Sequence, residues 1–115
     1  MFDMDEDRRR HPRYEVENLP GTLAGRERHD FRVLMLSRGG VLGTTRWEPP
    51  LGQVLDLEVP LGTRIFRAPA RVVFVGEDQS AEVPRHRRFR VGLALNGLTT
   101  EDGDILDTFI RELTG

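Results

Sequence analysis

Short runs of alternating apolar and polar residues, separated by turn-forming residues, make up most of this chain. In residues 53–61, "QVLDLEVPL", the side chains of Leu55, Leu57 and Val59 fall on one face, which is the two-residue period of a half-buried strand. Similar patterns, rich in β-branched and aromatic residues, predict further strands at 14–25, 30–37, 41–46, 63–76 and 89–98.

Turn signals separate these predicted strands. They are "RGG" at 38–40, "EPPLG" at 48–52 and the polar stretch "EDQSAEVPRHRR" at 77–88, which has no period and is expected to be a loop. Pro20-Gly21 indicates a bend or bulge in the first strand, and Pro69 indicates a bend in the long fifth one.

The period changes after residue 98, where "TTEDGDILDTFIRELTG" begins. Its apolar residues lie at helical spacing and form one face: Ile105, Leu106, Phe109, Ile110 and Leu113. Thr99 or Thr100 is expected to cap the start of this helix, with acidic residues in its first turn. The predicted fold is therefore mainly β, a small barrel or sandwich of about six strands, followed by one C-terminal helix.

The chain of 115 residues is long enough for one domain and too short for two cores. We divide it into a flexible Arg-rich arm at 1–13, a β-barrel at 14–98 and a helix at 99–115. The net charge of −2 gives no general attraction to nucleic acid or an anionic membrane, so an anion site must be local. All seventeen basic residues are arginine, whose planar guanidinium forms bidentate hydrogen bonds and stacks on flat rings.

Several classes of protein are disfavoured by what the sequence lacks. There is no cysteine, which excludes disulfides and thiolate sites and fits a reducing compartment. The first residues lack the apolar core of a signal peptide, and the longest apolar runs, "VLML" and "VVFV", are too short to cross a bilayer. We therefore expect a cytoplasmic protein without membrane insertion.

Catalytic and metal-binding patterns are also missing. The three histidines, His11, His29 and His86, are far apart and have no metal-ligand spacing, so we expect no metal and no cofactor. Ser37 lacks the flanking glycines of a nucleophile elbow, and no phosphate-binding loop with a lysine is present. The chain is therefore not expected to be an enzyme.

Two short motifs remain as candidate ligand-binding segments. The arm contains Arg9-Arg10-His11-Pro12-Arg13, an R-x-x-x-R spacing in which the proline disfavours a continuous helix. The strand at 30–37 ends in Met35-Leu36-Ser37-Arg38-Gly39-Gly40. If that strand is regular, Met35 and Ser37 share a face, and the two glycines allow a ligand or a backbone to approach closely.

In this order the two motifs resemble the signature of the PilZ domain family, R-x-x-x-R followed by [D/N]-x-S-x-x-G. Arg9 and Arg13 match the first motif, while Ser37 and Gly40 match two of the three defined positions of the second. The lead-in "RRRHPRY", the strand "FRVGLAL" and the C-terminal helix are also typical of the family, so the resemblance covers essentially the whole chain.

The resemblance implies a six-stranded β-barrel with a C-terminal helix that binds the bacterial second messenger cyclic di-GMP. Arg9, Arg10 and Arg13 would contact the phosphates and guanines, and Ser37 and Gly40 would line the barrel side of the site. Guanidinium groups suit such a ligand, because they bind phosphates and guanine edges and stack on flat bases. The chain would then be a non-enzymatic receptor or adaptor that signals through a protein partner.

Met35 departs from the family motif, because it stands where the family has Asp or Asn. A thioether cannot replace the hydrogen bond that a carboxylate or amide makes to a guanine edge. A buried donor left without a partner costs about 1–3 kcal/mol, or about ten- to a hundredfold in affinity. Met35 could equally extend the apolar face of Phe31 and Val33.

Three hypotheses follow. The first is a receptor for cyclic di-GMP. The second is a degenerate PilZ domain that no longer binds the ligand and works as a constitutive protein-interaction module; Met35 is the feature that favours it. In the second, the arginines are a solvated tail and Ser37–Gly40 is an ordinary turn. The third is a nucleic-acid binder that uses Arg8–Arg13 and "RHRRFR" at 85–90. The acidic remainder of the chain and its few aromatic residues argue against it.

Overall fold

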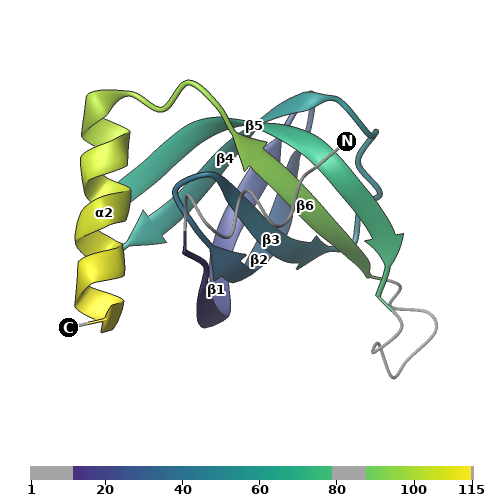
Figure 1. Ribbon diagram of the computed structural model, residues 1–115. Helices are drawn as coiled ribbons and strands as arrows, with labels where there is room; N and C mark the ends of the chain where they lie inside the picture. The colour runs from purple at the N-terminus through teal and green to yellow at the C-terminus, as the bar shows by residue number, and fades with distance from the viewer. Residues whose placement is uncertain (1–11, 79–87, 115) are drawn as a thin grey trace.

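The computed structural model describes residues 12–78 and 88–114 (Figure 1), in which six strands form a closed barrel beside a C-terminal helix. All neighbouring strands are antiparallel, and the order around the barrel is β1-β2-β3-β6-β5-β4. The elements are β1 (Tyr14–Ala24), β2 (Arg28–Leu36), β3 (Gly40–Thr45), β4 (Val54–Leu61), β5 (Arg64–Glu77), β6 (Phe89–Leu95) and α2 (Thr100–Thr114). The mainly β fold, the six-stranded barrel and the C-terminal helix are thus confirmed.

The predicted strand boundaries hold to within two residues for five of the strands. The exception is β6, which was expected to reach residue 98 and ends at Leu95. Gly97, with a φ of 75°, adopts a backbone conformation that favours glycine, and the chain turns there toward α2. Residues 1–11 and 79–87 lie outside the described residues, and with them Arg9, Arg10 and most of the predicted 77–88 loop.

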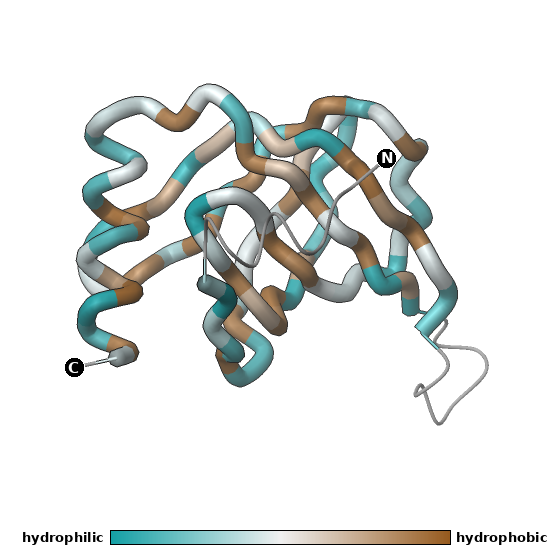
Figure 2. Tube along the Cα trace, viewed as in Figure 1, coloured by the Kyte–Doolittle hydropathy of each residue, from teal (hydrophilic) through white to brown (hydrophobic). Residues whose placement is uncertain are grey.

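The core fills the inside of the barrel, as the alternating pattern requires. Leu55, Leu57 and Val59 of β4 are almost fully buried, while the residues between them face outward. Residues 66–72 of β5 and the residues of β6 show the same alternation of buried and outward-facing positions. Figure 2 shows apolar (brown) and polar (teal) stretches following one another along the chain. Phe31 and Phe66 are the largest side chains that are fully buried.

Two bulges interrupt this alternation on neighbouring parts of the wall. In β2, Val33 pairs with Gly43 and Met35 pairs with Leu42, so Leu34 is an extra residue without a partner. The bulge turns Met35 away from the core, and Leu36 is buried in its place. The expectation that Met35 continues the apolar face of Phe31 and Val33 is therefore wrong, because the strand is not regular.

The second bulge lies in β5, where Val72 pairs with Leu93 and Phe74 pairs with Gly92. Val73 is the extra residue, and Phe74 lies on the outer surface with 49% of its area exposed. Pro69 pairs in regular register with Asp56, so the irregularity of this strand lies at Val73 and not at the proline.

In β1 the register shifts between Glu15 and Leu19, and Asn18 has a φ of 42°. Asparagine tolerates this left-handed conformation better than most residues. Pro20 and Gly21 pair regularly with β2, so the bulge lies just before the Pro-Gly pair that was expected to cause it.

Helix α2 lies against β5 and β4. Thr99 is its cap, because its hydroxyl accepts a hydrogen bond from the backbone N–H of Asp102 at 3.1 Å and donates one to the Asp102 carboxylate at 2.8 Å. The same carboxylate accepts a hydrogen bond from the backbone N–H of Arg67 in β5 at 3.2 Å. The first half of the predicted apolar face is buried at Ile105 and Leu106, while Leu113 is exposed.

Candidate functional site

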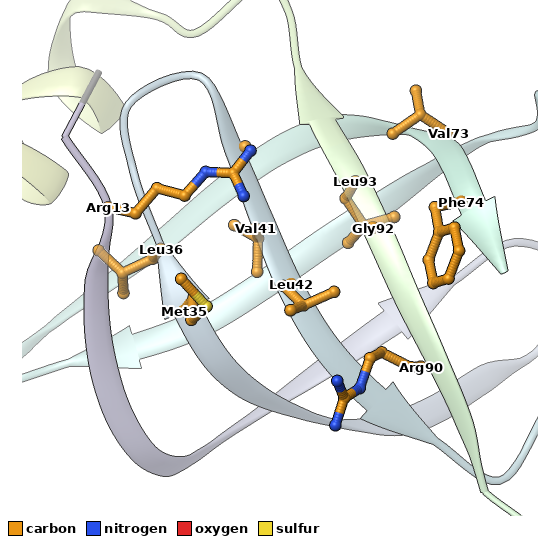
Figure 3. A pocket seen from close by; sticks show the side chains of 11 residues that line it. Arg13, Met35, Leu36, Val41, Leu42, Val73, Phe74, Arg90, Gly92 and Leu93 are labelled. Carbon is orange, nitrogen blue, oxygen red and sulfur yellow. The ribbon is translucent and has the colours of Figure 1, made fainter. Parts of the chain in front are cut away.

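A pocket of about 620 Å³ lies on the outer surface of the barrel, across β2, β3, β6 and β5 (Figure 3). Most of its lining is apolar, and its two charged residues are both arginines. The lining residues are Arg13, Met35, Leu36, Gly40, Val41, Leu42, Val73, Phe74, Arg90, Gly92 and Leu93. A pocket of this size and lining is suited to a small molecule with apolar or aromatic parts and negative charge.

The floor of the pocket is one row of residues that crosses four strands. Met35 pairs with Leu42, Leu42 pairs with Gly92, and Gly92 pairs with Phe74. The two bulges create this row, since each turns one of its end residues, Met35 or Phe74, away from the core.

Arg13 and Arg90 stand on opposite sides of this row. Arg13 immediately precedes β1 and extends its side chain over the pocket, whereas Arg90 approaches from β6 (Figure 3). Of the predicted arm residues, the structure thus places Arg13 at the pocket, whereas Arg9 and Arg10 lie outside the described residues.

Ser37 is buried and holds the turn between β2 and β3 together. Its hydroxyl accepts hydrogen bonds from the backbone N–H groups of Gly39 at 3.2 Å and Gly40 at 3.1 Å, and donates one to the Gly40 carbonyl at 3.2 Å. Ser37 does not line the pocket, so it does not share a surface with Met35 as a regular strand would require. Contact between Ser37 and a ligand stays a prediction.

Gly40 lines the pocket and is also needed for the close approach of β3 to β6. A Cβ atom at this position would lie 2.7 Å from the carbonyl oxygen of Leu93, which is closer than real side chains come. The glycine of the motif therefore has a structural reason that is independent of any ligand.

Arg38, in the same turn, connects the edge of the pocket to the C-terminal helix. Its guanidinium forms an ion pair with Asp107 of α2 at 2.9 Å, and it lies so close to Gly103 that a Cβ atom there would be 2.9 Å from Nη2. The two partners are 48% and 39% exposed, so the pair is accessible to water and salt.

Sequence reasoning missed Leu42, Phe74, Arg90 and Gly92 as pocket residues. A signal was present, because the runs "VLML" at 33–36 and "VVFV" at 72–75 break the two-residue period. Four consecutive apolar residues in a barrel strand cannot all face the core, and each run contains a bulge.

Residues 12–78 and 88–114 were also compared with what a metal site or a membrane-spanning helix would require. No three His, Asp or Glu side chains in this part of the chain are grouped so that they could hold a metal ion. His29 stacks on Trp47, with ring centroids 4.1 Å apart and planes within 10°, at a place that is not part of the pocket. No helix in the described part of the chain is long and apolar enough to cross a membrane.

Comparison with known proteins identifies a family. A family model described as "PilZ domain" matches residues 7–112. No curated protein sequence matches this chain. The similar solved structures include the Bacillus subtilis inhibitor of motility (MotI/DgrA), with a TM-score of 0.76 and 19% identity, over 93% of this chain and 52% of that one.

Two structures of Escherichia coli YcgR are also similar. YcgR in complex with c-di-GMP has a TM-score of 0.70 and 20% identity, over 93% of this chain and 46% of that one. The PilZ domain of YcgR with c-di-GMP has a TM-score of 0.67 and 19% identity, over 92% of this chain and 94% of that one. This chain thus spans about half of MotI and of full YcgR, and almost all of the isolated YcgR domain.

Proposed function

This chain belongs to the PilZ domain family, and we propose that it is a non-enzymatic bacterial receptor for cyclic di-GMP. The ligand would lie in the outer pocket across β2, β3, β6 and β5. The observation that carries the proposal is the composition of that pocket, an apolar floor between two arginines with no carboxylate in its lining.

This composition suits a cyclic dinucleotide. The ligand carries two phosphates and two flat guanine bases, and arginine can bind phosphate through paired hydrogen bonds and stack on a base. Arg13 is the motif residue that lines the pocket, and Arg9 and Arg10, which precede it in the chain, would join it when the arm closes over the ligand. Two structures of the same fold, both of Escherichia coli YcgR, contain c-di-GMP.

Met35 determines how tightly the pocket binds. Its thioether can contact the face of a base but cannot accept a strong hydrogen bond from a guanine edge. Because Met35 points into the pocket and not into the core, its replacement of Asp or Asn affects the ligand directly. We propose that the site is weaker than one with the complete motif.

The readout of the bound state would be a protein partner that recognises the ligand-bound surface. The second candidate function is a degenerate PilZ domain that does not bind cyclic di-GMP and acts as a constitutive interaction module. Met35 is the specific observation that favours this alternative.

Isothermal titration with cyclic di-GMP separates the two. We expect micromolar binding by the wild-type chain and a loss of at least about tenfold in Arg13→Ala, because one charge-assisted contact contributes roughly 1.5–3 kcal/mol. Arg26→Ala is the matched control, since Arg26 is exposed in the turn between β1 and β2 and does not line the pocket. Absence of binding in the wild type would reject the receptor and favour the interaction module.

A further inference from the structure

The outer wall of the barrel has a slot above Gly92. Leu42 on one neighbouring strand and Phe74 on the other both pair with Gly92, which has no side chain to fill the space between them. Neighbouring strands lie about 4.8 Å apart, so the backbones of Leu42 and Phe74 are roughly 9.6 Å apart. The two side chains thus flank a position that has no side chain of its own, and a flat ring lying there would contact carbon atoms at about 3.5–4.0 Å.

Phe74 forms one wall of this slot and is an unusual residue for the outside of a barrel. Its side chain is 49% exposed. The ring lies over Gly76, where an added Cβ atom would be 3.0 Å from its tip, and an added Cβ atom at Gly92 would be 3.2 Å from its Cβ. Gly76 and Gly92 thus leave room for the Phe74 side chain, and one side of its ring stays open to the pocket.

Arg90 lies at one end of the slot. It pairs with Gly76, over which the Phe74 ring lies, and it lines the pocket on the side opposite to Arg13, with its side chain running from β6 toward β3 (Figure 3). Within the described residues the Arg90 side chain is exposed and forms no ion pair. Its hydrogen-bond donors are therefore available to a ligand.

We propose that the slot above Gly92 holds one guanine base of the ligand. Phe74 stacks on the base, and Arg90 donates a pair of hydrogen bonds to the guanine O6 and N7 atoms at the end of the slot. Adenine presents an amino group in place of O6, so this contact would select guanine over adenine. The inference rests on the proposed function and adds two residues that lie outside both sequence motifs.

The test is titration of the full chain with cyclic di-GMP and cyclic di-AMP. We expect Phe74→Ala to weaken cyclic di-GMP binding by roughly 5- to 150-fold, the effect of removing one stacking aromatic ring, and Phe74→Trp to retain it. Arg90→Ala should lose the preference for guanine over adenine. Ile65→Ala is the matched control, because Ile65 is an exposed apolar residue of the same strand that does not line the pocket.

The outcomes separate this inference from the proposed function. If Arg13→Ala loses binding while Phe74→Ala and Arg90→Ala bind as the wild type does, the slot is rejected and the receptor stands. If the wild type does not bind cyclic di-GMP, the receptor is rejected, and guanosine monophosphate is titrated while the Gly92 amide resonance is followed by NMR. A shift in the wild type that is lost in Phe74→Ala supports the slot, and no shift rejects it as well.

Discussion

Replacement of Ser37 by alanine tests whether this motif residue maintains the fold or contacts the ligand. The side chain is 1% exposed, and its hydroxyl accepts hydrogen bonds from two backbone N–H groups, those of Gly39 and Gly40. Each such bond contributes about 0.5–1.5 kcal/mol net, so the loss of both costs about 1–3 kcal/mol. The Gly40 carbonyl keeps its bond from the Ser37 backbone N–H at 2.9 Å, so it adds little to the cost.

Urea unfolding followed by circular dichroism measures this loss as a change in the free energy of unfolding. In a domain of this size it corresponds to a fall in Tm of roughly 4 °C per kcal/mol. Thr63→Ala is the control, because Thr63 is an exposed hydroxyl residue in the turn between β4 and β5. A loss below about 0.5 kcal/mol would mean that the Ser37 hydroxyl does not hold the turn together. Loss of ligand binding at unchanged stability would assign the hydroxyl to ligand contact instead.

Three further predictions follow from other contacts. Met35→Asp should strengthen cyclic di-GMP binding about ten- to a hundredfold in isothermal titration by restoring an acceptor, with Met35→Leu as a control that should not. A double-mutant cycle on Arg38 and Asp107 should give a coupling of about 0.2–1 kcal/mol that decreases with salt, because the pair is partly exposed; no coupling at low salt would contradict this. Gly43→Ala should cost about 3 kcal/mol or more in urea unfolding, since a Cβ atom there would collide with the Arg32 carbonyl and the buried Phe31 ring; near-native stability would refute this.

The elements, and their boundaries except the end of β6, could be predicted because they follow from local patterns. Alternation in β4 fixes which of its residues are buried, and the helical spacing at Ile105 and Leu106 indicates the face of α2 that meets the barrel. Thr99 rather than Thr100 is the cap because its hydroxyl accepts the hydrogen bond from the backbone N–H of Asp102, a contact that spacing alone does not determine.

The pocket could not be predicted, because it depends on register between strands that are distant in sequence. Met35 and Phe74 reach its floor only through bulges, and Leu42 and Gly92 become their neighbours through cross-strand pairing. The apolar runs show that the alternation must break, but they do not show which residue is the extra one. The motif around Ser37 was predicted as a ligand-binding motif. In the structure the Ser37 hydroxyl forms hydrogen bonds within the turn between β2 and β3.

The most direct test of the central claim is an NMR titration of the wild-type chain with cyclic di-GMP, in which the shifts of backbone amides are followed. We expect the largest shifts at Gly40, Leu42 and Gly92, which line the pocket, and little change at Gly62, which lies in the turn between β4 and β5. Shifts centred elsewhere, for example around the stacked His29 and Trp47, or no shifts at all, would contradict it.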